Sequence, residues 1–368
     1  MPQKKGFSLP IIIVTLAALG LIAFLGFKNF SQKNSPTLAP ANNSSAKQEP
    51  KTDLFMTKLT YEGAYNGPLY DTSSKIGDSA PMDLHFENMD RNGVNFLIGY
   101  FFAEEVASTD YVKGAIAKHP GRIIPFYSSG LGGKEAERFV GEELTKRFEM
   151  SLPWAKRHLG ESTIQGIGEI EIFQWNMPHN DPRILQLFDF ASKNNLKVMT
   201  HPVPGKMQQV GDILEKYPDT IFLIHMFQDD FARERANIIE LMKIHNNLYF
   251  TIDVDHLLYD RVAGTGLLYK YEGKDVGAGK NGFIKDFDSK YQGMLKADLS
   301  LYKPLIEAHP DRVTWGTEMN IRYTYEVDVY DRMIKFIRLF IGSLDPSVQE
   351  NIGYKNALRV FGEGVRFE

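Results

Sequence analysis

Cysteine is absent from the 368 residues of this chain. Its absence excludes disulfide bonds, thiolate metal sites and cysteine nucleophiles, and it leaves the redox compartment undefined. The composition is typical of a packed globular protein, with 43% hydrophobic, 24% charged and 12% aromatic residues. The length is sufficient for one large domain together with a membrane segment.

Acidic residues outnumber basic ones beyond the first 51 residues. Those residues contain six lysines and one glutamate, a charge of +5, so the net charge of −4 leaves −9 on residues 52–368. An acidic domain repels phosphate backbones, which argues against a nucleic-acid partner. The basic N-terminus, residues 1–6 with Lys4 and Lys5, suits an anionic membrane surface.

Residues 7–27 contain no charged side chain. As a helix they would extend roughly 31 Å at about 1.5 Å per residue, close to the thickness of a hydrocarbon core. We therefore predict a single-pass transmembrane anchor, with the N-terminus inside and the domain outside the cytoplasm. A cleaved signal peptide is the alternative, but its apolar region is usually only about 7–15 residues long.

The segment after the anchor, residues 28–52, is rich in Asn, Ser, Pro, Ala and Gln. Such a segment buries too little apolar surface to become ordered, so we interpret it as a flexible linker. The residues around Lys5 and Gly6 resemble a type IV prepilin leader, which is cut after a glycine. The resemblance is weak, because Ile11 stands where such leaders usually carry Glu.

Short apolar runs alternate with helical patterns from residue 66 onward. The runs are rich in Val, Ile and Phe, as expected for parallel strands buried on both faces. Eight strand–helix units predict an α/β fold, a (β/α)8 TIM-type barrel over residues 53–368. An open doubly wound sheet is the alternative, but no glycine-rich phosphate loop follows the first run. The predicted strands are residues 69–71, 94–100, 123–127, 164–172, 198–201, 221–225, 248–253 and 313–317, and residues 182–194 and 231–245 are among the predicted helices.

A long glycine-containing insert, residues 257–296, follows the seventh predicted strand. Loops at the carboxyl ends of barrel strands build active sites, so this insert is a candidate lid. A surface excursion without a role is the alternative. Tyr269, Tyr271 and Phe283 either cover a bound ligand or pack the insert onto the barrel.

Three polar side chains lie on predicted strands four, five and six. Glu169 lies in the fourth run, and His201 and His225 close the fifth and sixth. One carboxylate and two imidazoles form a ligand set that zinc accepts, so we predict one divalent metal, with zinc favoured. A pair of hydrogen-bonded core histidines without a metal is the alternative. Glu171, two residues after Glu169, is predicted to share its face of the strand.

Glu318 ends the eighth predicted strand, where a general base would lie in a barrel. An ion pair with a nearby cation such as Lys75 or Arg322 is the alternative. We also predict Glu171, Asp253 and Arg322 as candidate substrate-binding residues. No feature of the sequence indicates an oligomeric state.

Several motifs, in this order, resemble the amidohydrolase superfamily, in particular its amidohydrolase-related branch, over about residue 70 to the C-terminus. The Gly-Glu-Ile and His-x-Phe motifs are also similar to TatD-like hydrolases. The resemblance implies a (β/α)8 barrel, in agreement with the strand count, and a hydrolase of small molecules. The motifs are Asn92-Gly93-Val94, His119-Pro120-Gly121-Arg122, Gly166-Ile167-Gly168-Glu169, Thr200-His201-Pro202, Leu223-Ile224-His225, Asp311-Arg312-Val313-Thr314-Trp315-Gly316-Thr317-Glu318 and Asn356-Ala357-Leu358-Arg359-Val360-Phe361.

The first strand departs from the family pattern. Members of the superfamily carry Asp-x-His-x-His there, whereas this chain has Asp71, then Ser73 and Lys75 in place of the two histidines. An ammonium in that pocket repels a nearby cation, so a two-metal site is not expected. The resemblance implies that Glu169, His201 and His225 bind a single ion.

Two functions follow from these residues. The first is a single-metal hydrolase of a small molecule, in which Glu318 takes a proton from water and Lys75 stabilises negative charge on the substrate. The second is a catalytically degenerate barrel in which Lys75 pairs with Glu318 or Glu169. Such a barrel would serve as an envelope ligand-binding or scaffold protein.

Overall fold

A computed structural model describes residues 54–76, 81–102, 106–128, 142–161, 163–175, 177–253, 267–271, 273–364 and 366. The chain divides into two compact units, Met1–Thr52 and Asp53–Glu368. The predicted basic N-terminus (1–6), transmembrane anchor (7–27) and linker (28–52) lie outside the described residues. Within the described ranges, no helix is both long and apolar enough to cross a membrane.

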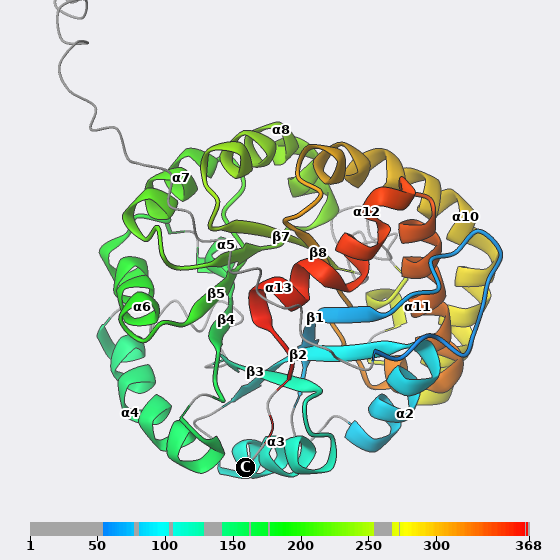
Figure 1. Cartoon of the computed structure of the whole chain (residues 1–368), viewed down its shortest axis with the longest axis horizontal. Helices are drawn as coiled ribbons and strands as arrows, with labels where there is room; N and C mark the ends of the chain where they lie inside the picture. Colours follow the sequence, from blue (N-terminus) through cyan, green and yellow to red (C-terminus); the bar gives the residue numbers. More distant parts are fainter. Residues whose placement is uncertain are drawn as a thin grey trace, which may run out of the picture. The chain divides into compact units, whose positions relative to one another are not determined.

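Eight parallel strands close into a barrel in chain order, β1 to β8, with helices around it (Figure 1). Each strand pairs with its neighbours in the sequence, and β1 closes the barrel by pairing Asp71 with Trp315 of β8. The predicted TIM-type barrel is therefore confirmed. The strands are β1 (Leu69–Lys75), β2 (Val94–Phe102), β3 (Ile123–Ser128), β4 (Gly166–Ile170), β5 (Lys197–Thr200), β6 (Phe222–Ile224), β7 (Leu248–Asp253) and β8 (Val313–Gly316).

The strands are almost fully buried, because side chains on one face fill the barrel and those on the other face pack against helices. Two of the strand predictions differ most from the structure. β1 extends to Lys75 rather than ending at residue 71, because it continues pairing with β2 as far as Tyr100. β4 ends at Ile170, earlier than predicted, because residues Ile172–Trp175 turn into a short helix.

The predicted helix at 182–194 is observed as α6, and Asp181 caps it by accepting a 2.9 Å hydrogen bond from the backbone N of Arg183. The α-helices are α2 (Met82–Asn92), α3 (Val106–Lys118), α4 (Glu142–Leu159), α5 (Ile172–Trp175), α6 (Pro182–Lys193), α7 (Met207–Lys216), α8 (Gln228–Ile244), α10 (Val276–Ala308), α11 (Val327–Gly342), α12 (Pro346–Glu350) and α13 (Asn356–Phe361). Shorter helical segments are η2 (Tyr269–Tyr271), η3 (Arg322–Tyr325) and the π-helix η4 (Asn351–Lys355).

The predicted insert at 257–296 is only partly a loop. Its second half is the start of α10, which Asp275 caps through a 2.9 Å hydrogen bond from the backbone N of Ala278. Phe283 is buried on α10 and lies 6.2 Å from Tyr323, ring centroid to ring centroid, so it packs the helix onto the barrel. Residues 257–266 lie outside the described part of the chain, and the lid remains a prediction.

The amino-terminal end of the barrel is closed by the C-terminal helix α13, which crosses the strands in Figure 1. Phe361 of α13 packs between Tyr70 and Phe126, with ring centroids 6.4 and 5.9 Å away. The hydroxyl of Tyr70, which lies near the start of β1, donates a 3.0 Å hydrogen bond to the carbonyl of Gly362. Polar side chains gather at the opposite end of the barrel, where the carboxyl ends of the strands lie.

Candidate metal centre

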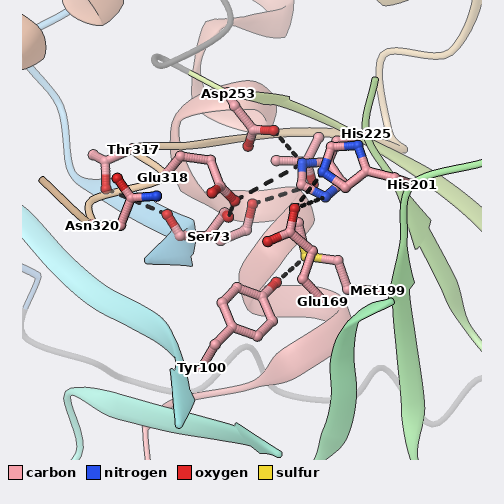
Figure 2. A network of polar contacts seen from close by, with 12 residues as sticks. Ser73, Tyr100, Glu169, Met199, His201, His225, Asp253, Thr317, Glu318 and Asn320 are labelled. Atoms are coloured by element: carbon pink, nitrogen blue, oxygen red, sulfur yellow. Dashed lines mark hydrogen bonds and ion pairs between the residues drawn. The ribbon is translucent and has the colours of Figure 1, made fainter. Parts of the chain in front are cut away.

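Glu169 enters the barrel from β4. The preceding residue, Gly168, has a φ of 152°, and a Cβ there would lie 2.8 Å from the carbonyl oxygen of Met199 on β5. Glycine is therefore required where the two strands approach so closely. The Glu169 side chain is only 9% exposed and points toward the histidines of the next two strands (Figure 2).

Two imidazoles meet this carboxylate. His201 follows β5 directly and His225 follows β6 directly, and both are buried. Oε1 of Glu169 contacts Nε2 of His201 and lies 3.0 Å from Nε2 of His225. The two imidazole centroids are 3.6 Å apart. The fold thus brings together the three residues that the sequence predicted as metal ligands.

Asp253, the last residue of β7, holds the other side of His225. Its Oδ2 contacts Nδ1 of the imidazole, and both side chains are fully buried. A carboxylate on Nδ1 fixes the ring orientation and leaves Nε2 to face Glu169. The sequence singled out Asp253 only as a substrate-binding candidate. Its contact with His225 was missed, because strand order alone does not show which carboxylate meets which imidazole.

Glu318 follows β8 and turns back into the barrel. Its backbone N donates a 2.8 Å hydrogen bond to the carbonyl of Ser73, and its Oε1 accepts a hydrogen bond from the Ser73 hydroxyl. Asp71 supports the same turn, since its Oδ1 accepts from the backbone N of Thr317 at 3.0 Å and its Oδ2 from the Thr317 hydroxyl at 2.6 Å. Oε1 of Glu318 lies 4.0 Å from Nδ1 of His225.

Lys75 ends β1 at the rim of this cluster. Its Nζ is 3.9 Å from Oε2 of Glu169, and its side chain is 44% exposed. The ammonium therefore faces both the buried carboxylate and solvent. Of the two partners that the sequence suggested for it, the observed ion pair is with Glu169.

The other two predicted substrate-binding residues, Glu171 and Arg322, belong to neither group of candidate metal ligands among the described residues. Glu171 does not share a strand face with Glu169, because β4 ends at Ile170, and its Oε2 accepts a 2.6 Å hydrogen bond from Gln174 on α5. Arg322 is exposed on η3. In the described part of the chain, it forms no ion pair with Glu318.

Tyr100 was not singled out by the sequence, although it belongs to the same network. Its hydroxyl contacts Sδ of Met199 beside Glu169 (Figure 2). Tyr100 lies on β2 and Met199 on β5, so only the closure of the barrel brings them together. An aromatic residue in a strand carries no signal of such a contact.

Burial and close charges shift the protonation of these groups. Burial alone would lower the pKa of His225, but the carboxylates of Asp253 and Glu169 raise it well above its usual range. Burial, together with His225, lowers the pKa of His201 to about 4. Burial opposes ionisation of Glu169, yet the two imidazoles lower the pKa of this carboxyl well below its usual range.

The donor set fits a divalent cation. One donor atom each from Glu169, His201 and His225 lies within 4.8 Å of the other two, and all three residues are buried. Asp253 and Glu318 add two further buried carboxylates. Several negative groups removed from water require a positive partner, and three protein ligands with an open position are the usual arrangement of catalytic zinc.

The sequence matches a family model described as amidohydrolase over residues 98–362, more than half of the chain. The chain belongs to the amidohydrolase family. This assignment confirms the resemblance that the sequence motifs indicated. No curated protein sequence matches this amidohydrolase-family chain.

Several solved structures are similar to this amidohydrolase-family chain at low sequence identity. A probable 2-pyrone-4,6-dicarboxylic acid hydrolase from Acinetobacter baumannii, with citric acid bound, is 13% identical, with 80% of this chain and 99% of that chain covered and a TM-score of 0.48. An amidohydrolase from Burkholderia multivorans with bound zinc is 12% identical, with coverages of 81% and 100% and a TM-score of 0.45.

A third solved structure is a mutant 5-carboxyvanillate decarboxylase from Novosphingobium aromaticivorans, with manganese and 3-methoxy-4-hydroxy-5-nitrobenzoic acid bound. It is 11% identical, with 83% of this chain and 99% of that chain covered and a TM-score of 0.42.

Proposed function

We propose that this protein is a metal-dependent hydrolase of a small molecule that uses one divalent ion, zinc or a similar metal. The observation that carries the proposal is the convergence of Glu169, His201 and His225 on one buried point. These three residues would hold the ion, which would supply Lewis acidity toward a water molecule. Family membership is consistent with this chemistry.

Glu318 is the residue to which we assign the role of general base. Unlike Glu169 and Asp253, it contacts no imidazole closely, since its nearest imidazole nitrogen is 4.0 Å away. Burial and the neighbouring Glu169 and Asp253 carboxylates raise the pKa of Glu318 well above its usual range. A raised pKa makes this carboxylate a stronger base toward water.

Lys75 is the cation that we assign to the substrate side of the site. Its ammonium is half-exposed at the rim, with Nζ 3.9 Å from Oε2 of Glu169. A positive charge in that position stabilises negative charge that develops on a substrate oxygen. The role of Glu171 and Arg322 in substrate binding stays a sequence-based proposal.

Metal analysis of the purified protein tests the proposal. We expect about one equivalent of zinc after reconstitution, in keeping with one set of three protein ligands. A metal content near zero would contradict the proposal. The partly exposed histidine His158, on α4, offers a matched control, because His158→Ala should leave the metal content unchanged.

The 3.9 Å ion pair between Lys75 and Glu169 favours a second candidate. In that case the ammonium neutralises Glu169, no metal enters, and the barrel is a degenerate amidohydrolase that binds a ligand or serves as a scaffold. Chelators would then leave the melting temperature unchanged, whereas ligand binding to the native state would raise it. Thermal unfolding with and without a chelator therefore separates the two candidates.

We also propose that residues 7–27 anchor the protein in a membrane, with the barrel outside the cytoplasm. The support is the uncharged run itself, between Lys4, Lys5 and Lys28. Full-length protein should then fractionate with membranes and require detergent for extraction. Recovery in the soluble fraction would contradict the anchor without affecting the metal centre.

A further inference from the structure

The hydroxyl of Ser73 is the feature of the site that the proposed function does not use. Ser73 is fully buried on β1, and its Oγ donates a hydrogen bond to Oε1 of Glu318. Burial makes a charge-assisted hydrogen bond of this kind strong, because water does not compete for either partner. The carboxylate is therefore held at the β1 side of the barrel.

The backbone fixes the same pair of residues. The carbonyl of Ser73 accepts hydrogen bonds from the backbone N of Thr317 at 3.1 Å and of Glu318 at 2.8 Å. Glu318 has a φ of 51°, a left-handed conformation that few residues other than glycine adopt. Gly316 allows the close approach of the strands, because a Cβ there would lie 2.5 Å from Cβ of Ser73.

The Glu318 carboxylate that Ser73 holds lies on one particular side of the His225 imidazole. Oε1 of Glu318 is 4.0 Å from Nδ1, the nitrogen that Asp253 also contacts, whereas Nε2 faces Glu169 at 3.0 Å. Glu318 thus lies by the edge of the imidazole that does not face the predicted ligands. Yet His225, Asp253 and Glu318 have donor atoms close enough together to share an ion.

We propose that Ser73 is a positioning residue that keeps Glu318 available as a base and prevents it from becoming a metal ligand. The proposal rests on the proposed function, because it assumes an ion bound by Glu169, His201 and His225. A carboxylate that coordinates a cation cannot accept a proton from water as readily. Loss of the Ser73 hydroxyl frees Glu318 to move toward the ion.

The test is a Co2+ titration of the full-length protein followed by visible absorption, which reports both affinity and the number of ligands. In Ser73→Ala we expect Co2+ affinity to rise by about tenfold, the smallest factor associated with a charge-assisted hydrogen bond, and the spectrum to shift toward a higher coordination number. Glu318→Gln should bind Co2+ like the wild type. The double variant Ser73→Ala/Glu318→Gln should return to wild-type affinity and spectrum.

Ser74→Ala is the matched control. Ser74 is buried on the same strand, and its Oγ has no hydrogen-bond partner among the described residues, so this variant removes a neighbouring hydroxyl without touching Glu318. Wild-type behaviour is expected of it. An unchanged affinity and spectrum in Ser73→Ala would overturn the positioning role. Weaker Co2+ binding in Glu318→Gln would overturn it too, because Glu318 would then already be a ligand.

Failure of the proposed function gives a different result, namely no Co2+ uptake by the wild type. Crystal structures of the wild type and Ser73→Ala then decide the question about Ser73. We expect the Glu318 carboxylate to leave its position beside residue 73 in the variant. A carboxylate that stays in place would show that the backbone alone positions it, and the proposal would be wrong.

Discussion

The two ends of the barrel bury side chains of opposite character. At the amino-terminal end, Phe361 of α13 packs against Tyr70 and Phe126, in a plug of aromatic and aliphatic side chains. At the carboxyl end, buried carboxylates and imidazoles such as Glu169 and His225 contact one another. The first end gains stability from removing apolar surface from water, whereas the second loses solvation of its charges.

This contrast indicates that the amino-terminal end contributes mainly to stability and the carboxyl end mainly to function. An apolar plug is stabilised by close packing and buried area, and none of its side chains needs a charged partner. Buried charges need specific partners, and each one left without a partner is costly. We therefore expect substitutions at the plug to affect the free energy of unfolding, and substitutions at the cluster to affect metal binding.

The largest expected effect is the loss of metal binding in His201→Ala. This change removes one of three donors, so metal affinity should fall by more than the about 10–100-fold that is typical of residues that only orient a ligand. Calorimetric titration with Zn2+ measures the effect. Retention of wild-type Zn2+ affinity would show that metal binding does not depend on the cluster at the carboxyl end of the barrel.

Phe361→Ala tests the opposite end. The change leaves a cavity in the aromatic plug, and it should lower the free energy of unfolding by about 3–5 kcal/mol. Zn2+ affinity should stay at the wild-type value. Urea unfolding measures the loss, and Ile244→Ala, at a side chain that is 67% exposed, should change stability by less than about 0.5 kcal/mol.

Asp253→Asn tests whether a residue that only orients a predicted ligand contributes to metal binding. Because Asp253 contacts Nδ1 of His225, its loss should weaken Zn2+ binding by about 10–100-fold without abolishing it. Asp298→Asn is the matched control, because Asp298 is also a buried acid but accepts a 3.0 Å hydrogen bond from Gln228 on α8. Equal Zn2+ affinities in the two variants would remove Asp253 from the account of the metal centre.

The smallest expected effect concerns a buried histidine outside the cluster. His85 packs edge-on against Tyr325 and Tyr330, and neither ring nitrogen has a hydrogen-bond partner in the described residues. Burial, aided by Arg122, lowers the pKa of His85 to about 3. This residue is therefore neutral in the folded protein at neutral pH.

The direction of the pH effect follows from that lowered pKa. The unfolded chain takes up a proton on His85 below its ordinary pKa of about 6.5, whereas the folded chain does not. Stability from this residue is complete above about pH 6.5 and falls toward pH 3, by roughly 2 kcal/mol at pH 5. His85→Phe should lose that much less stability than the wild type between pH 7 and pH 5 in urea unfolding. Equal losses would contradict the assignment.

The sequence predicted the barrel well for a physical reason. Parallel strands buried on both faces require uninterrupted Val, Ile and Phe, so runs such as 94–100 and 248–253 identified strands with nearly their observed bounds. The exact ends of the strands and helices were less predictable. Glu171 fell outside β4 and Val276 began a long helix, because strand and helix ends depend on neighbouring segments as well as on local pattern.

The candidate site was likewise predictable only in part. Glu169, His201 and His225 were predictable from strand ends, since the carboxyl ends of barrel strands face one mouth. The roles of Ser73 and Asp253 were not, because their contacts join β1 to β8 and β7 to the end of β6. Tyr100 gave no signal at all.

By itself, the sequence determined the fold class, the acidic charge of the domain and the three residues that converge as candidate ligands. These follow from periodicity and residue type, which are local properties. Only the tertiary structure decided that Lys75 pairs with Glu169, that Asp253 holds His225, and that Ser73 holds Glu318. Such pairings depend on distances of a few ångströms between strands, and barrel closure sets those distances.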